Sequence, residues 1–160
     1  MAHVYHRNFT HFVWSTWDRT PLLNGDIERD VYALIQSQCS RMKVTLYALG
    51  GVADHVHLLV SLPRTLCLSD FMEAAKGVSS KALNDTHGSP TWAFRWQGSY
   101  SDHSVSASHM TRIRLYIENQ KQHHADNTLW LSCEPSDVAP GSNSDARNRS
   151  DAREGGDLHY

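Results

Sequence analysis

The chain has 160 residues, of which 40% are hydrophobic and 20% are charged. That length and composition are typical of one globular domain with a core of its own. The three cysteines are widely spaced and form no CxxC pair, which argues against a disulfide framework and a cysteine zinc site and favours a reducing, cytoplasmic location. No apolar run approaches the roughly 18 residues that span a bilayer, and the first residues lack the pattern of a signal peptide, so no membrane association is expected.

The formal net charge is −2 at pH 7, and the deficit lies entirely at the end of the chain. The first 135 residues carry equal numbers of acidic and basic side chains, which is unlike the basic surface of a non-specific DNA-binding protein. A nucleic-acid function must therefore depend on a local site. From Pro135 onward Ser, Asp, Asn, Gly and Arg dominate, which predicts a folded domain over 1–134 and a disordered acidic tail over 135–160.

Four elements are predicted in the first half of the chain. An aromatic and β-branched run predicts a strand over 9–17. Apolar residues at three- and four-residue steps then predict a helix that opens at Gly25-Asp26 and runs to about Met42. Residues 43–52 and 55–62 alternate as two strands joined by a short turn, which indicates a hairpin. The alternation in the first of these strands predicts one shared face for Val44, Leu46 and Ala48.

Three further elements are predicted in the second half. Ser69 is a suitable N-cap for a helix that ends before the turn residues at 88–90. A short aromatic strand is predicted over 92–96, followed by a loop-like or weakly extended segment. Ser108 can cap a third helix that runs to about His123.

The order strand–helix–strand–strand–helix–strand predicts an α+β protein with the ferredoxin-like split βαβ fold. This fold is an antiparallel sheet with helices on one face. The third helix lies outside that unit and carries a tyrosine.

The most informative short motif is the pair His55 and His57, which follows Asp54 directly. Residues two apart on a strand point to the same side, so both imidazoles are expected on the face opposite Val56 and Leu58. Two neighbouring imidazoles on an open sheet face can bind one divalent metal ion, and Asp54 can orient one of them from behind. The alternative is a pair of surface histidines on a half-exposed strand.

The helix predicted to follow Ser108 supplies a second candidate set. Tyr116 and Gln120 are four residues apart and share one helical face, with Arg112 one turn earlier. An arginine beside a tyrosine can contact a phosphate, and Gln120 can offer an oxygen ligand to a magnesium-like ion. The alternative is an amphipathic helix with a half-buried tyrosine, and His123-His124 is more typical of a solvated helix end.

Together the two sets describe one coherent chemistry. A bound metal ion neutralises and polarises an anionic phosphodiester. A tyrosine hydroxyl, with an ordinary pKa near 10, needs a nearby metal or arginine to ionise before it attacks. The phosphotyrosine so formed retains the energy of the broken bond, which suits strand transfer better than digestion.

Three stretches, ADHVHLLVSLP, WAFRWQGSY and RLYIENQKQHH, resemble the single-tyrosine HUH transposases of bacterial insertion sequences and the related REP-associated tyrosine transposases. The resemblance covers roughly Tyr5 to His124. It implies a transposase that cleaves and rejoins single-stranded DNA at hairpin-marked ends. It also implies one magnesium or manganese ion per site and a homodimer.

Residue by residue, the resemblance makes His55 and His57 metal ligands and Gln120 the third ligand. Tyr116 is the matching nucleophile, which forms a 5′-phosphotyrosine link and frees a 3′-hydroxyl. The segment 98–106 departs from the family's glycine-tyrosine-glycine run, which bears on the geometry of the loop near the site.

Two other function classes remain open. One is a non-catalytic single-stranded nucleic-acid binding module that stacks bases on Trp92, Trp96 and Tyr100. It predicts binding that ignores divalent metal and survives loss of the Tyr116 hydroxyl. The other is a zinc hydrolase that uses His55, His57 and another histidine with water as the nucleophile. It predicts retained zinc and no covalent DNA adduct.

Overall fold

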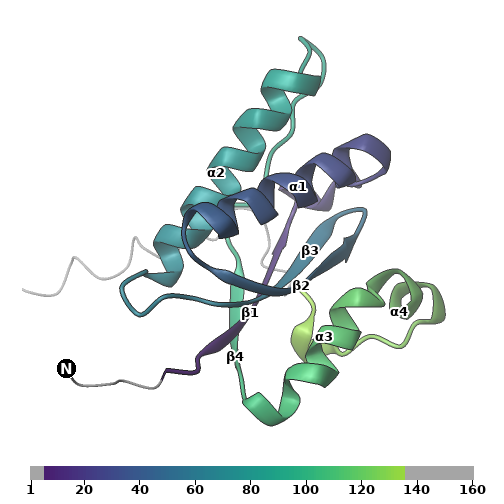
Figure 1. Ribbon diagram of the computed structural model, residues 1–160. Helices are drawn as coiled ribbons and strands as arrows, with labels where there is room; N and C mark the ends of the chain where they lie inside the picture. Colours follow the sequence, from purple (N-terminus) through teal and green to yellow (C-terminus); the bar gives the residue numbers. More distant parts are fainter. Residues whose placement is uncertain (1–5, 136–160) are drawn as a thin grey trace, which may run out of the picture.

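A computed structural model describes residues 6–135, and the chain is coloured along its length in Figure 1. The predicted acidic tail therefore lies outside the described residues apart from Pro135. The strands and helices follow one another as β1 (Phe9–Ser15), α1 (Gly25–Arg41), β2 (Thr45–Val52), β3 (His55–Ser61), α2 (Leu68–His87), β4 (Ser101–Val105), α3 (Met110–Glu118) and α4 (Gln120–Asp126). None of the described helices is long and apolar enough to cross a membrane.

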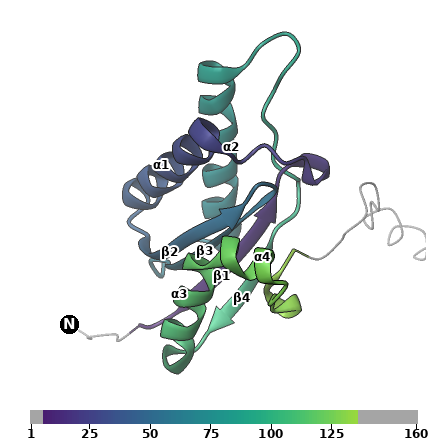
Figure 2. The ribbon, with the colours of Figure 1, turned by 90° about the vertical axis from the view of Figure 1, so that its right-hand side faces the viewer.

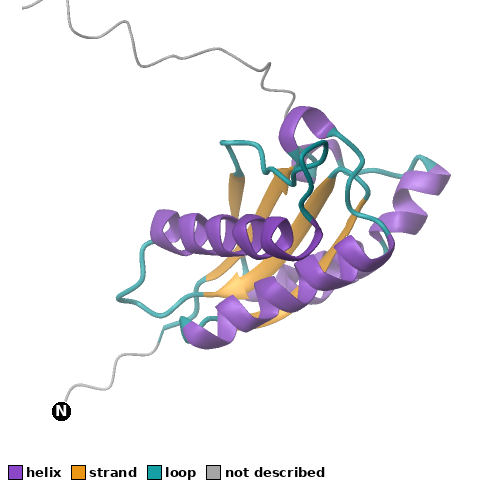
Figure 3. Cartoon of the chain, turned by 90° about the horizontal axis from the view of Figure 1, so that it is seen from above, coloured by secondary structure: helices purple, strands orange, loops and turns teal. Residues whose placement is uncertain are grey.

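The four strands form one antiparallel sheet in the order β2-β3-β1-β4. Each half contributes a strand–helix–strand unit, and the two units interleave so that β1 and β3 lie at the centre. This is the predicted ferredoxin-like split βαβ arrangement, and the α+β fold class is confirmed. Helices α1 and α2 lie side by side over one face of the sheet (Figures 1 and 3), while α3 and α4 lie on the opposite side (Figure 2).

The main core lies between the sheet and the α1–α2 layer. On β3 the side chains alternate, so that Val56, Leu58 and Val60 point into this core with no exposed surface. The apolar stripe of α1 meets them through Val31 and Ile35, which are also fully buried. Burial of each such side chain stabilises the fold by roughly 1.5–3 kcal/mol. Residues of α2 belong to the same core, so β3 packs against both helices.

A second, smaller core lies on the other face of the sheet. Ala48, Leu59 and Ile117 form it, with partly buried neighbours that include Ile113. Helix α3 approaches β2 closely at this point because Gly50 has no side chain. A Cβ added there would meet the backbone carbonyl oxygen of Ile117. Glycine at position 50 therefore allows the tyrosine helix to dock on the sheet.

The prediction of a strand over 92–96 is wrong. These residues form only isolated bridges, and the fourth strand is β4, in the segment expected to be loop-like or weakly extended. The aromatic run has another cause: Phe94 and Trp96 fill the main core, and Trp96 Nε1 donates a hydrogen bond to Ser79 Oγ at 2.8 Å. The polar segment pairs with β1 as an edge strand, where alternate side chains reach solvent.

Three local predictions also need correction. A register shift between Leu46 and Ala48 places Leu46 against the main core and Ala48 in the smaller one, so the two do not share a face. Helix α2 begins at Leu68, one residue before the predicted Ser69 cap. The predicted third helix is two helices, α3 and α4, because the backbone leaves helical geometry at Asn119 (φ −106°, ψ 21°).

Replacement of Gly50 by alanine tests the close approach of α3. We expect Gly50→Ala to lower the free energy of unfolding by about 1–3 kcal/mol, because α3 must shift away from β2. Gly77→Ala is the matched control: its Cβ would meet nothing, and a helical alanine is favoured over glycine by up to about 1 kcal/mol. Urea unfolding midpoints measure both. Equal stabilities for the two variants would contradict this packing.

Candidate metal and tyrosine site

His55 and His57 lie on β3 and face away from the main core, as the alternation predicts. The prediction of an open sheet face is wrong, because both residues are fully buried. The covering elements are α3, α4 and the segment 130–134, which lie against this face (Figure 2). The pair is therefore enclosed in a low-dielectric site and is not a pair of solvated surface histidines.

A hydrogen bond at Nδ1 fixes the orientation of each imidazole. His55 Nδ1 lies 2.6 Å from Asp54 Oδ1, and Asp54 is itself held by Arg19 Nε at 2.9 Å. His57 Nδ1 lies 3.0 Å from His11 Nε2 on the neighbouring strand β1. Because Nδ1 is engaged in both rings, Nε2 is the atom that each ring presents to the space beneath α3.

Helices α3 and α4 bring the predicted tyrosine and glutamine to the same place. Tyr116 and Gln120 are each 1% exposed. The Tyr116 ring lies edge-on to His57, with 6.0 Å between ring centroids. Neither polar atom of the Gln120 amide makes a hydrogen bond of good geometry with residues 6–135, although the amide lies near the Tyr116 hydroxyl. A buried amide this poorly satisfied is costly and indicates a site that a ligand completes.

Arg112, the predicted phosphate contact, lies farther out. Its guanidinium is 4.5 Å from the centre of the Trp130 ring, which in turn stacks on Tyr116 at 4.3 Å and an interplanar angle of 7°. The backbone N–H of Trp130 donates a hydrogen bond to the Tyr116 hydroxyl at 3.2 Å. Trp130 therefore separates Arg112 from the tyrosine and holds the tyrosine ring in place.

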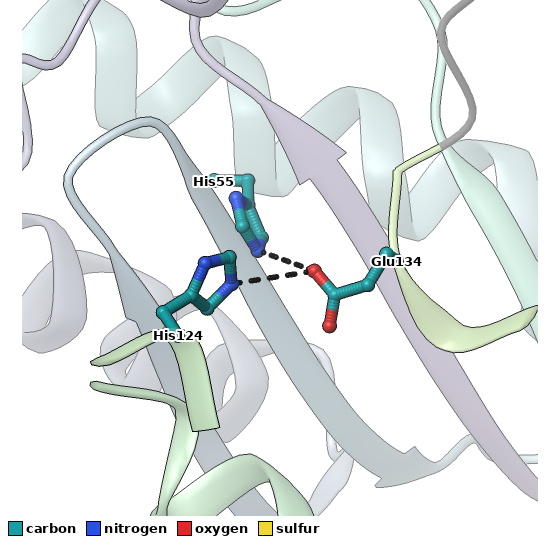
Figure 4. Close-up of side chains that lie close together, drawn as sticks. All are labelled: His55, His124 and Glu134. Carbon is teal, nitrogen blue, oxygen red and sulfur yellow. Dashed lines mark ion pairs between the residues drawn. The ribbon is translucent and has the colours of Figure 1, made fainter. Parts of the chain in front are cut away.

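Two further groups at the centre of the site, Glu134 and His124, were not predicted from the sequence to belong to it. Glu134 accepts a hydrogen bond from the Tyr116 hydroxyl, and its Oε2 lies 3.1 Å from His55 Nε2. His124 Nε2 lies 3.4 Å from the same oxygen, so the three side chains converge (Figure 4). The prediction of His124 as a solvated helix end is wrong, although its spacing of four residues from Gln120 does place both on one face of α4.

The donor atoms fit a divalent metal ion. The nearest ligand atoms of His55, His124 and Glu134 all lie within 4.8 Å of one another. Nε2 of His57 and Nε2 of His124 are buried without a hydrogen-bond partner among the described residues. Imidazole nitrogens and a carboxylate oxygen that converge in this way are the donors that protein-bound divalent ions use.

The charges at the site are set by burial and by mutual contacts. Burial lowers the pKa of His57 well below its ordinary value, and the neighbouring His55 and His11 lower it further. Burial also lowers the pKa of His11, to about 4. His57 and His11 are therefore neutral at pH 7, which is the form that binds metals. Burial acts in the same direction on His55, but its contacts with Asp54 and Glu134 outweigh burial and raise the pKa of His55.

The pKa values of Glu134 and Tyr116 shift in opposite directions. Burial alone would raise the pKa of Glu134, but hydrogen bonds from His55 and Tyr116 outweigh it and hold that pKa at about 2. Burial and the contact with Glu134 raise the pKa of Tyr116 to about 12. At neutral pH the site thus contains a carboxylate anion and a protonated tyrosine.

The aromatic residues of the binding-module alternative are placed differently. Trp96 is 6% exposed and belongs to the main core, and Trp92 and Tyr100 pack against the same core. Their rings therefore support the fold beside α2 and do not line the sheet face that carries the histidines. This placement disfavours stacking of bases on all three.

Several known proteins are similar to this chain over most of its length. The family profile described as "Transposase IS200 like" matches residues 4–120. The ISDra2 transposase TnpA of Deinococcus radiodurans is 25% identical over 123 residues, which covers 74% of this chain and 87% of that protein. The transposase for insertion sequence element IS200 of Salmonella typhimurium is 27% identical over 125 residues, covering 75% and 81%.

Two solved structures share the fold. A Deinococcus radiodurans R1 protein described as a transposase superposes with a TM-score of 0.60 at 26% identity, covering 75% of this chain and 96% of that one. A REP-associated tyrosine transposase, solved bound to a REP hairpin, superposes with a TM-score of 0.59 at 14% identity, covering 89% and 96%.

These matches define the class of the protein as a transposase, a DNA-processing enzyme. The chain belongs to the family of IS200-like transposases. The resemblance to single-tyrosine HUH transposases that the three sequence stretches suggested is confirmed.

Because His11 and His57 are buried in the neutral form, the stability of the metal-free protein depends on pH. The pKa of His11 is about 4 in the folded state against an ordinary 6.5, so the unfolded chain binds a proton more readily. Stability is then fully present above about pH 6.5 and falls as the pH drops toward 4, by about 3 kcal/mol from this group.

We therefore expect His11→Gln to flatten the loss of stability between pH 6.5 and 4. Urea midpoints of chelator-treated protein at stepped pH would measure it, with the exposed His6→Gln as control. An unchanged slope in His11→Gln would contradict the assignment of a buried neutral imidazole at position 11.

Proposed function

We propose that the protein cleaves and rejoins single-stranded DNA at hairpin-marked ends through a 5′-phosphotyrosine intermediate on Tyr116. The observation that carries the proposal is that the Tyr116 hydroxyl and Nε2 of His55 meet at one carboxylate in a buried site. A tyrosine and a metal-binding histidine held this close can act on the same phosphate group. The related REP-associated tyrosine transposase was solved with a REP hairpin, which supports hairpin DNA as the partner.

In the proposed reaction the Tyr116 oxygen attacks the scissile phosphorus. The bond from phosphorus to the 3′ oxygen breaks, and the tyrosine proton ends on that oxygen, so the upstream fragment leaves with a 3′-hydroxyl. The downstream fragment stays on Tyr116 through its 5′ phosphate, as a phosphodiester. Attack of a second 3′-hydroxyl on this link reverses the step and releases the tyrosine, so no nucleotide cofactor is consumed.

His55, His57 and Gln120 would hold one magnesium or manganese ion. Such an ion, when bound, neutralises a non-bridging phosphate oxygen and polarises the phosphorus. The chain's own contribution is orientation: Asp54 and His11 fix the two imidazoles through Nδ1, and Gln120 directs an otherwise unpaired amide into the site. The neutral state of His57 at pH 7 suits this role.

Tyr116 must part from Glu134 before it attacks. The hydroxyl is committed to the carboxylate, and burial together with this contact raises the pKa of Tyr116 to about 12. A scissile phosphate that enters the site takes the place of the carboxylate beside the hydroxyl. Trp130 keeps the ring oriented meanwhile, through its stacking contact.

We further propose that the protein works as a homodimer, as the family resemblance implies. Within the described residues, α3 docks on β2 of the same chain, so Tyr116 faces the histidines of its own chain. A dimer of this form has two complete sites and requires no exchange of tyrosine helices.

Removal of the nucleophilic oxygen tests the proposed chemistry. We expect Tyr116→Phe to reduce formation of covalent protein–DNA adduct by at least about 1,000-fold, since no other atom replaces the attacking oxygen. Binding to the same DNA should change by no more than about fivefold, because only one hydrogen-bonding group is lost. Denaturing gels of labelled single-stranded hairpin DNA, with manganese, magnesium or chelator, measure the adduct.

The partly exposed Tyr47 provides the matched control, and Tyr47→Phe should retain the adduct. Normal cleavage by Tyr116→Phe would show that the nucleophile is another group. Metal-dependent cleavage without any adduct in the unmodified protein would favour hydrolysis by water.

A further inference from the structure

We propose that His124 and Glu134 join His55 as ligands of a transition-metal ion, and that this site prefers Mn²⁺ or Zn²⁺ to Mg²⁺. The proposal deepens the proposed function, on whose metal site it rests, by naming two more ligands and the class of ion. It goes beyond the family resemblance, which assigns only the histidine pair and Gln120.

The three ligands come from parts of the chain that are far apart in sequence. His55 begins β3, His124 lies on α4 and Glu134 follows the turn at Leu131–Cys133. Glu134 Oε2 lies 3.1 Å from His55 Nε2 and 3.4 Å from His124 Nε2. Two ligands of one ion, each about 2.0–2.2 Å from the metal, are separated by roughly 3.0–3.5 Å, so these spacings fit shared coordination.

Nε2 of His124 makes no hydrogen bond with residues 6–135 that would explain its position. The atom is buried, and the ring centre of His124 lies 5.1 Å from that of His55. Glu134 is only 10% exposed and carries its carboxylate into a cluster of imidazoles. A buried imidazole nitrogen without a hydrogen bond is costly, and a cation shared with the adjacent carboxylate offsets that cost.

The donor set determines the class of ion. Imidazole nitrogens bind zinc and later first-row ions better than they bind magnesium, which prefers oxygen ligands and retains its waters. Two histidines and one glutamate form the donor set of many catalytic zinc sites. His57 Nε2, 3.8 Å from the other oxygen of Glu134, supplies a further nitrogen nearby. The site should therefore bind Zn²⁺ and Mn²⁺ more tightly than Mg²⁺.

The direct test is metal binding by the full-length protein, stripped with chelator and measured without DNA. Titration calorimetry and the electron paramagnetic resonance of free Mn²⁺ give the affinities, with Zn²⁺ and Mg²⁺ as parallel titrants. We expect Glu134→Gln and His124→Asn each to weaken Mn²⁺ binding at least about tenfold. Loss of a residue that only hydrogen-bonds to a metal ligand already weakens binding by about that factor, and loss of a ligand should cost no less. The exposed Glu118→Gln and His109→Asn are matched controls and should bind normally.

A spectroscopic measurement separates a ligand from a structural residue. The visible absorption of bound Co²⁺ reports coordination number, and we expect it to change in Glu134→Gln and to recover in part in Glu134→Asp. Circular dichroism of each variant checks that the fold persists. If Glu134→Gln and His124→Asn bind Mn²⁺ like the unmodified protein while His57→Asn does not, the proposed ligand set is wrong.

The two proposals fail in different ways. Normal metal binding by Glu134→Gln, together with adduct formation by the unmodified protein, would overturn this inference and leave the proposed function standing. Loss of metal binding in Glu134→Gln, with no adduct from the unmodified protein, would support the ligand set and count against the tyrosine chemistry. Tighter binding of Mg²⁺ than of Mn²⁺ would overturn the preference for a transition metal.

Discussion

The site depends on the two-residue alternation of β3. One side of this strand supplies Val56, Leu58 and Val60 to the main core, and the other side presents His55 and His57. Because β3 is central in the sheet, hydrogen bonds to β1 and β2 hold it on both edges. A slip of one residue would exchange the two faces, so core packing and imidazole placement are fixed by the same register.

Burial of so many polar groups is tolerable only because the groups satisfy one another. Asp54 and His11 engage the outer nitrogens of the histidine pair, and Glu134 engages the Tyr116 hydroxyl. Among the described residues, several of the buried side-chain atoms without a hydrogen bond lie together in this site, on Nε2 of His57, Nε2 of His124 and the Gln120 amide. This grouping indicates that a ligand binds here, since buried polar atoms in folded proteins rarely remain without partners.

Local periodicity was enough to predict β1, β2, β3 and both core helices, and it placed Tyr116 and Gln120 near each other, although the two residues lie on separate helices. Periodicity failed to predict segments whose conformation depends on tertiary contacts. The aromatic run at 92–96 has strand-like composition but is held by burial of its rings, and the shift at Ala48 depends on how α3 meets β2. Glu134 could not be found, because a lone glutamate near the end of the domain has no spacing that relates it to His55. Its place depends on the return of the chain over α3.

Because the domain has no excess of basic residues, DNA recognition should depend strongly on the enclosed site. With equal numbers of acidic and basic residues before residue 136, the domain lacks the general attraction for phosphates that a basic surface provides. Specific contacts at the enclosed site must then contribute a larger share of the free energy of DNA binding than they do in a basic protein. The carboxylate of Glu134 inside this site repels the phosphates of DNA unless a cation lies beside it. Metal and DNA should therefore bind cooperatively, because the ion converts an anionic pocket into one that accepts a phosphate.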